Sequence, residues 1–328
     1  MADCHKNFLT ARDSFHSKVA LDDTKKEFLK TSRKNLRKHI KTKFNEKDRP
    51  TIKFQIQGSF LMNTAVNPID GDYDIDDGLY FKPQLEDRPT PETAHAWVVE
   101  AAKSYGTVDP PIDKNRCVRV PFKAGYHVDI PIYDLIDEGD EIFSPELAIK
   151  NDGWKYSDPK KITEWFKDRV SATNPQLRRL VRYFKAWADY QNQKSNSKMP
   201  SGLVLTILAS EEYQFDKRDD VAFGETASAT LQRIEDDESI PNPVDPNEDL
   251  RDRITDAQFN NFKKSLELLV QNAEDALNHK SAEEAARKHW RKVLGDRFPI
   301  IEDDSDKSGE KAKTYPAPGI IGVSSESA

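Results

Sequence analysis

Cysteine and long apolar runs are scarce in this sequence. The 328 residues include two cysteines, Cys4 and Cys117, without CxxC spacing, so neither a disulfide framework nor a thiolate zinc site is expected. The longest apolar stretch, residues 203–209, is far shorter than the roughly 20 residues that a membrane-spanning helix needs. The opening MADCHKNF lacks the apolar region of a signal peptide. We therefore expect a cytoplasmic protein with no membrane partner and no redox chemistry.

Positive charge is not in excess either. The chain has 50 Lys and Arg against 57 Asp and Glu, a formal net charge of -7. Non-specific coating of nucleic acid depends on a basic surface, so nucleic acid is not expected as an obligatory partner. Binding of small anionic ligands is still compatible with this net charge, because the electrostatic field inside a cleft depends on nearby charges more than on the total charge.

A long helix is predicted for residues 21–47. The apolar residues Leu29, Leu36, Ile40 and Phe44 form one stripe of this segment, and basic residues lie elsewhere on it. The run KKEFLKTSRKNLRKHIKTK could be a nucleic-acid patch, but a solvated face is the more common meaning of such a run. We interpret the segment as a scaffold helix.

Short runs with β-rich composition follow the scaffold helix. They are TIKFQIQ, DIDDGLYF, VRVPF and HVDIPIY, separated by Gly, Pro and Asp, and each predicts a strand. One helix interrupts them, PETAHAWVVEAAKSYG, with Pro91 near its start, apolar residues at helical spacing and Gly106 at its end. Residues 1–155 are therefore predicted as a lobe with a sheet and packed helices.

Helical signals dominate residues 156–300, which we predict to form a second lobe. LRRLVRYFKAWADYQ carries an apolar face made of Leu177, Leu180, Val181, Phe184 and Trp187. Capping-box spacing joins Thr255 to Gln258 and Ser281 to Glu284, and Gly295 followed by Pro299 ends the last helix. Residues 301–328 are rich in charge, Ser, Gly and Pro, which predicts a mobile tail. The fold class is thus α+β, with a sheet lobe and a helical lobe.

Three aspartates stand out in the predicted strands. Side chains two apart on a strand project to the same face, so Asp74 and Asp76 share one face. In HVDIPIY the apolar residues face inward and Asp129 stands on the opposite side. Gly58 and Ser59 form a small-residue turn shortly before the first pair. The strands thereby supply three carboxylates beside one turn.

Three carboxylates on adjoining strands suit two Mg²⁺ ions, with Mn²⁺ as a substitute, because these hard cations prefer oxygen ligands. Two metals about 4 Å apart can activate an attacking hydroxyl and stabilise a leaving pyrophosphate. Asp129 is expected nearest to the attacking hydroxyl. The backbone N–H groups of Gly58 and Ser59 would hold a triphosphate in a nest.

Two other interpretations of DGDYDIDD were weighed. The segment could be an acidic surface turn, which is a common feature of proteins. A calcium loop of the EF-hand type would place Asp72, Asp74 and Asp76 at its first ligands, but its sixth position is Asp77 where Gly is required, and its twelfth is Pro83 where Glu is needed. The calcium loop is therefore rejected.

Two further residues near the aspartates were assigned to packing. His127 beside Asp129 could be a metal ligand, but neighbouring strand residues point to opposite faces, so we expect a packed or hydrogen-bonded histidine. Tyr80 could stack on a base, but an aromatic residue in a strand is usually packed.

The chain resembles the nucleotidyltransferases with a polymerase-β-like core, and within them the CD-NTases, bacterial relatives of animal cGAS. GS followed by DxD is shared by the superfamily, whereas DIDDGLY with HVDIPIY narrows the resemblance to bacterial enzymes similar to cyclic-dinucleotide synthases. Further similarity lies in KNRCVRV, LRRLVRYFKAWADYQ, the PSG before LVLTILA, and NPVDPNEDL. The resemblance runs from about residue 57 to residue 250 in the same order.

The resemblance implies roles for individual residues. It assigns metal binding and catalysis to Asp74, Asp76 and Asp129. It implies nucleotide contacts at Gly58, Ser59, Phe60, Met62, Asn63, Thr64, Arg119, Lys185 and Ser201. Helix periodicity adds that Arg178, Arg182 and Lys185 lie opposite the apolar stripe and could reach triphosphate oxygens. Ser201 could instead cap its helix, and Asp245 in NPVDP is a common turn former.

The resemblance also implies a function, the joining of ATP or other NTPs into a cyclic di- or trinucleotide second messenger in bacterial antiphage (CBASS) signalling. A linear oligonucleotide synthase, a transferase acting on a small molecule or RNA, and an inactive nucleotide-sensing protein stay open as alternatives. A monomer is expected, and the resemblance allows conjugation of the C-terminus by partner proteins. The ordinary interpretation of that terminus is a disordered tail. No zinc-binding insertion is evident.

Overall fold

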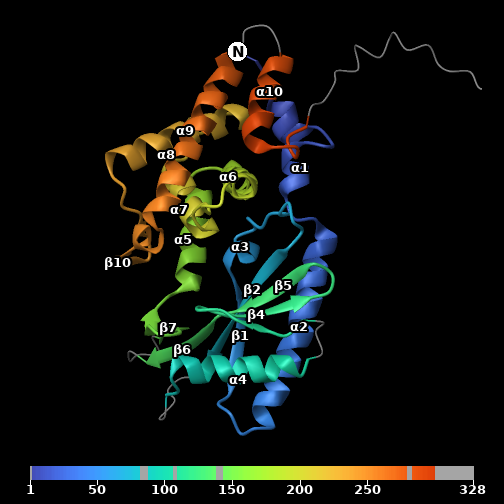
Figure 1. Ribbon diagram of the computed structural model, residues 1–328, viewed down its shortest axis with the longest axis vertical. Helices are drawn as coiled ribbons and strands as arrows, with labels where there is room; N and C mark the ends of the chain where they lie inside the picture. Colours follow the sequence, from blue (N-terminus) through green and yellow to red (C-terminus); the bar gives the residue numbers. More distant parts are fainter. Residues whose placement is uncertain (1, 82–87, 106–108, 138–142, 279–282, 300–328) are drawn as a thin grey trace, which may run out of the picture.

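The computed structural model describes residues 2–81, 88–105, 109–137, 143–278 and 283–299. It has two parts, a lobe built on a sheet and a lobe of helices, as predicted (Figure 1). The tail 301–328 and the capping residue Ser281 lie outside the described residues. Within the described ranges, no helix combines the length and the apolar composition needed to cross a membrane.

The sheet has β2 (Tyr73–Phe81) at its centre. It is built from β1 (Ile52–Gln57), β2, β3 (Ile112–Asp113), β4 (Val118–Phe122), β5 (Tyr126–Ile130), β6 (Ile132–Asp137), β7 (Phe143–Ile149) and β8 (Gly153–Tyr156). β1 pairs with β2 antiparallel, whereas β5 and β6 pair with β2 parallel. The acidic segment of β2 therefore lies beside the segment that carries Asp129.

The predicted strand 127–133 is divided at Pro131 into β5 and β6. Proline has no N–H to donate to a sheet ladder, although the Pro131 carbonyl still accepts a hydrogen bond from the Leu79 N–H at 2.9 Å. The register is unchanged across the break, since Asp76 pairs with Asp129 and Leu79 pairs with Ile132. The side chains thus keep their alternation along the whole run.

Two helices cover one face of the sheet. α2 (Asp23–Asn45) begins at the cap Asp22, whose side chain accepts from the Lys25 N–H, and α4 (Pro91–Lys103) begins at the cap Thr90. The buried stripe of α2 is the predicted one, and it packs with the inward residues of the strands and with α4 in one hydrophobic cluster. Asp74 and Asp76 lie on the opposite face of the sheet, away from this cluster.

The second lobe is helical from α5 onward. Its helices are α5 (Pro159–Ala172), α6 (Gln176–Lys194), α7 (Gly202–Glu211), α8 (Asp219–Asp236), α9 (Asp256–Asn278) and α10 (Glu283–Leu294), with the hairpin β9 (Pro241–Asn242) and β10 (Asp245–Asp249) and the 3-10 turn Leu250–Arg253. The predicted apolar face of α6 is buried in this core. The capping box at the start of α9 is confirmed, because Thr255 and Gln258 exchange hydrogen bonds.

The first residues of the chain pack with the helical lobe. Phe8 and Phe15, in or beside the short helices Lys6–Thr10 and α1 (Phe15–Val19), are fully buried, and the Phe8 ring meets Trp290 of α10 edge-on at 4.9 Å. Hydrophobic contacts therefore place residues 8–19 with the helices, and the chain crosses to the sheet before α2 (Figure 1). This differs from the expectation that all of residues 1–155 form the sheet lobe; the lobe boundaries themselves stay a prediction.

Candidate active site

A tight turn connects β1 to the site. The chain leaves Gln57 and enters the one-turn helix α3 (Gly58–Leu61) with Gly58 at φ 67°, a left-handed conformation that glycine adopts without the cost of a side chain. A Cβ at Gly58 would lie 2.1 Å from an Asp76 carboxylate oxygen. The glycine is needed both for the turn and for the close approach of Asp76.

The three predicted carboxylates share one face of the sheet. Asp74 and Asp76 lie on β2 and are half-buried, and Asp129 on β5 is 8% exposed. The parallel register places Asp76 directly beside Asp129. The pKa of Asp74 is raised by burial and by Asp129, and the pKa of Asp76 is raised further by burial, Asp74 and Asp129. Such a cluster favours a cation, because the carboxylates crowd like charge in a poorly hydrated place.

Arg119 holds Asp129 in a two-pronged ion pair. Its Nε and Nη2 atoms donate to the two Asp129 oxygens, each at 2.8 Å, and Lys114 Nζ is 3.9 Å away. Arg119 was predicted to contact nucleotide, yet its nearest anion in this structure is the third carboxylate. The pairing follows from the sheet, since Arg119 on β4 is the register partner of Asp129. Each Asp129 oxygen accepts one of these bonds and keeps a second lone-pair site with which it could bind a metal ion.

The prediction that His127 points away from Asp129 is wrong. The two residues are two apart on β5, so their side chains share a face, and His127 Nε2 lies 3.8 Å from an Asp129 oxygen. Donor atoms of Asp74, His127 and Asp129 all lie within 4.8 Å of one another. Tyr80, in contrast, is packed as expected, stacked on Tyr133 with ring centres 4.6 Å apart.

Three basic side chains on α6 donate hydrogen bonds to the turn that follows Gly58. Arg178 Nε donates to the Met62 carbonyl at 3.4 Å, Arg182 donates to the Asn63 carbonyl at 2.6 Å, and Lys185 Nζ donates to Thr64 Oγ1 at 3.1 Å. Each contact spans the two lobes. Arg178 and Arg182 thus bind backbone rather than facing the cavity, whereas Lys185 lines it.

Burial also changes the Lys185 amine. It lowers the pKa of Lys185 to about 8, although Asp74 and Asp76 oppose the shift. A lysine that titrates in this range still carries charge at neutral pH and is poorly hydrated, which suits contact with a phosphate.

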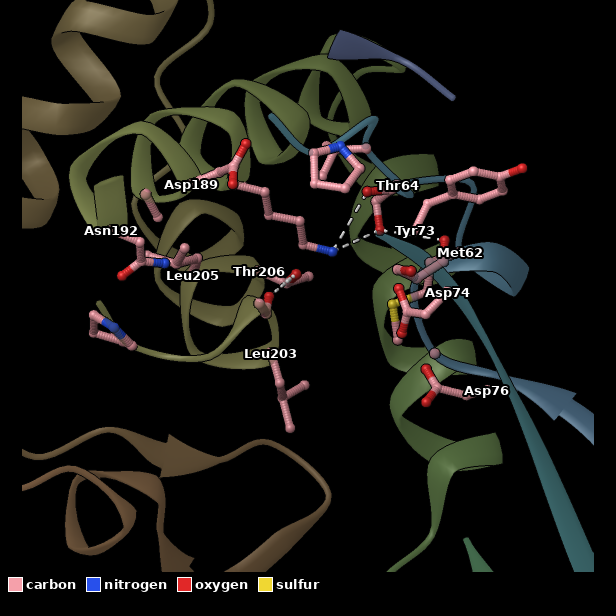
Figure 2. Close-up of a pocket in the computed structure, with 18 of the residues that line it drawn as sticks. Met62, Thr64, Tyr73, Asp74, Asp76, Asp189, Asn192, Leu203, Leu205 and Thr206 are labelled. Atoms are coloured by element: carbon pink, nitrogen blue, oxygen red, sulfur yellow. Dashed lines mark hydrogen bonds between the residues drawn. The ribbon is translucent and has the colours of Figure 1, made fainter. Parts of the chain in front are cut away.

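A cavity of about 430 Å³ opens between the turn, β2 and the helices α6 and α7. Figure 2 shows Thr64, Asp74 and Asp76 on one side of it and Asp189, Asn192 and Thr206 on the other. The sequence analysis missed the second group. Asp189 and Asn192 follow Lys185 at helical spacing, so the periodicity of α6 could have found them.

The predicted nucleotide contacts divide into two groups. The first lines the cavity and consists of Gly58, Ser59, Met62, Thr64 and Lys185, together with Asp74 and Asp76. The second does not line it and consists of Phe60, Asn63, Arg119 and Ser201. Phe60 packs against the core of the sheet lobe, and Ser201 caps α7 by accepting from the Val204 N–H. Asp245 accepts from the Asn247 N–H in its turn, as a turn former does.

Comparison with known proteins matches this same region. Residues 52–133 match the family described as "Cyclic GMP-AMP synthase DncV-like, nucleotidyltransferase domain". A cyclic GMP-AMP synthase of Escherichia albertii is 29% identical over 209 residues, 59% of this chain and 44% of the relative. A cyclic AMP-AMP-AMP synthase of an Acinetobacter strain is 26% identical over 284 residues, 82% of this chain and 78% of the relative. The chain thus spans less than half of the length of the first of these relatives.

The fold agrees with solved structures. The DncV cyclic AMP-GMP synthase of Vibrio cholerae, solved in complex with a linear intermediate, superposes with a TM-score of 0.76 at 20% identity. The similarity covers 92% of this chain and 98% of that one. By sequence and by fold, the chain is thus similar to the CD-NTases, and its sheet lobe has the polymerase-β-like nucleotidyltransferase fold.

Proposed function

We propose that the protein joins nucleoside triphosphates into a cyclic di- or trinucleotide and releases pyrophosphate at each bond formed. The observation that carries the proposal is the cluster of Asp74, Asp76 and Asp129, of which Asp74 and Asp76 line the cavity together with the Gly58 turn and Lys185. Relatives that match this region are named as cyclic GMP-AMP and cyclic AMP-AMP-AMP synthases. The site and the relatives thus support the same chemistry.

Asp74, Asp76 and Asp129 are the residues that would hold two Mg²⁺ ions. Their fit to a divalent cation rests on the raised pKa values of Asp74 and Asp76, which come from burial and mutual repulsion and which a cation would relieve. When bound, the ions would neutralise phosphate charge and favour loss of a proton from the attacking hydroxyl.

The other residues bind and orient the substrate. The N–H groups of Gly58 and Ser59 and the Lys185 ammonium face the triphosphate from two sides of the cavity. A ribose hydroxyl of a second nucleotide attacks the α-phosphorus; the new P–O bond forms as the bond to the β-phosphate oxygen breaks, and pyrophosphate leaves. The proton leaves toward Asp129, whose carboxylate Arg119 holds in place. Repetition at the other end closes the ring.

The test is product analysis. The protein is incubated with the four NTPs and Mg²⁺, the products are treated with phosphatase, and their masses are measured. A cyclic product survives because it has no removable terminal phosphate. A phosphatase-sensitive ladder would instead assign the protein to linear synthesis, and a nucleotide attached to an added RNA or small molecule would assign it to the transferases.

Replacement of the metal-binding pair tests the mechanism. D74N and D76N should each abolish pyrophosphate release, because amides cannot supply the charge that the metal ions need. Lys150→Gln is the matched control, since Lys150 pairs with Asp113 outside the cavity. Turnover by the double variant D74N/D76N would refute the metal mechanism.

The product would then act as a second messenger in bacterial antiphage defence. Phage plating on a host that carries the gene, with the D74N gene as control, tests this role. Equal efficiency of phage plating on the two hosts would contradict the proposed role in defence.

A further inference from the structure

The imidazole of His127 lies between Asp72 and the acidic cluster. It is 4% exposed, and its Nδ1 atom is 2.7 Å from Asp72 Oδ1. An ionised carboxylate only accepts hydrogen bonds, so Nδ1 carries the proton and donates it to Asp72. In the neutral ring the other nitrogen, Nε2, then has a lone pair.

That lone pair has no hydrogen-bond partner among the described residues, and Nε2 is buried. Its neighbours are carboxylates: Nε2 is 3.8 Å from Asp129 Oδ2, and with a ligand atom of Asp74 the three donor atoms lie within 4.8 Å of one another. A buried polar atom without a partner is costly. Ionised carboxylates cannot donate to Nε2, whereas a cation between the three groups would satisfy all of them.

His95 shows the difference between this arrangement and an ordinary buried histidine. It too is fully buried and pairs through Nδ1 with a carboxylate, Asp113, at 2.7 Å. Its Nε2 atom, however, is hydrogen-bonded to the Ala148 carbonyl at 3.2 Å. His95 therefore presents no free lone pair, and it provides a matched control.

We propose that His127 Nε2 is a metal ligand together with Asp74 and Asp129, and that Asp72 orients the ring through Nδ1. The inference rests on the proposed function in one respect, that Asp74 and Asp129 bind a divalent cation. A carboxylate that accepts from the far nitrogen of a ligating histidine is a recurrent arrangement around protein-bound metals, where it fixes the tautomer and the ring orientation.

The donor set determines which metal fits. One imidazole nitrogen with two carboxylates favours Mn²⁺ over Mg²⁺, which prefers oxygen alone. Two ligand atoms about 2.1 Å from one ion are at most about 4.2 Å apart, so a group that spans 4.8 Å must contract by at least roughly 0.6 Å. Release of an Asp129 oxygen by Arg119 gives that carboxylate the freedom to move.

The experiment uses the full chain with one equivalent of Mn²⁺ and no nucleotide. Pulsed EPR on the wild type should show coupling of the metal to an imidazole nitrogen. The coupling should disappear in H127Q and persist in H95Q. Titration by EPR should show a Kd for Mn²⁺ that is about 10- to 100-fold weaker in D72N, since loss of an outer-shell partner has effects of this size. H127D, which supplies oxygen in place of nitrogen, should bind Mn²⁺ without the nitrogen signal.

A wild-type spectrum without nitrogen coupling overturns the inference, whether or not any variant folds. Coupling that persists in H127Q, with the far-UV circular dichroism of the wild type, overturns it as well. Mg²⁺-supported turnover of the same preparations keeps the two proposals apart. An active wild type without nitrogen coupling removes only the His127 ligand, and nitrogen coupling in a protein that makes no product removes only the proposed function.

Discussion

Gly58→Ala is the perturbation that separates backbone strain from damage to the active site. The residue has φ 67°, and any L side chain there costs about 1–2 kcal/mol in stability. The new Cβ would also lie 2.1 Å from Asp76 Oδ2, whereas real Cβ atoms essentially never come closer than 3.0 Å. The Asp76 carboxylate must therefore retreat by about 0.9 Å, the difference between these two distances.

A displacement of this size should be costly for catalysis. A reacting group misplaced by about 1 Å can lose about 100-fold in rate, which corresponds to about 2.7 kcal/mol in the activation barrier. We therefore expect G58A to lose about 100-fold in pyrophosphate release at saturating NTP, with unfolding in urea showing a loss of only about 1–2 kcal/mol in stability.

Gly153→Ala is the matched control for this experiment. Gly153 also has a positive φ, 90°, but a Cβ there would meet nothing within 4 Å. G153A should lose similar stability and keep its activity. If G58A retains activity within a few-fold of G153A, the close approach of Asp76 to the turn does not position a catalytic group, and the reasoning is refuted.

The other predictions concern Lys185 and Asp219. Because burial lowers the pKa of Lys185 to about 8, KM for NTP should rise as pH passes upward through about 8, and K185M should raise KM by about 10- to 100-fold at neutral pH, as loss of a charge-assisted hydrogen bond does. The free energy of unfolding should increase with pH between about 8 and the ordinary lysine pKa of 10.5. In this window the unfolded lysine binds more protons than the folded one, so a rise in pH favours the folded state. A free energy of unfolding in urea that does not change with pH would contradict this. Asp219 is fully buried and accepts from Arg179 at 2.7 Å and from the Tyr183 hydroxyl at 2.8 Å, so D219A should destabilise the protein by about 3–5 kcal/mol, and D219N, which still accepts hydrogen bonds, should lose less.

Strand alternation explains how much of the site was predictable. It correctly placed Asp74 and Asp76 on one face, opposite the buried Ile75, Leu79 and Phe81, because this periodicity depends only on local backbone geometry. The same rule, applied correctly, would have placed His127 on the face of Asp129. The spacing of His127 and Asp129 in the sequence was therefore sufficient to place the two side chains on one face.

Pairing between distant segments was not predictable in the same way. The bond from Arg119 to Asp129 depends on the register of β4 against β5, and the contact of Phe8 with Trp290 joins the two ends of the described chain. In both cases, the local sequence pattern of one segment does not indicate which distant segment it contacts. Apolar periodicity identified the buried face of α6, but it could not state that Arg178 and Arg182 on its other side would bind backbone carbonyls.

Those carbonyl contacts connect the fold to the chemistry. Arg178, Arg182 and Lys185 lie at helical spacing on α6 and bind three consecutive residues, 62–64, of the segment that follows Gly58. Just before that segment, Gly58 lies so close to Asp76 that a side chain at residue 58 would collide with the Asp76 carboxylate. A shift of α6 relative to the sheet would therefore move the turn and, through it, the carboxylates proposed to bind metal. Because α6 is itself packed in the core of the helical lobe, the relative placement of the two lobes sets the geometry of the site.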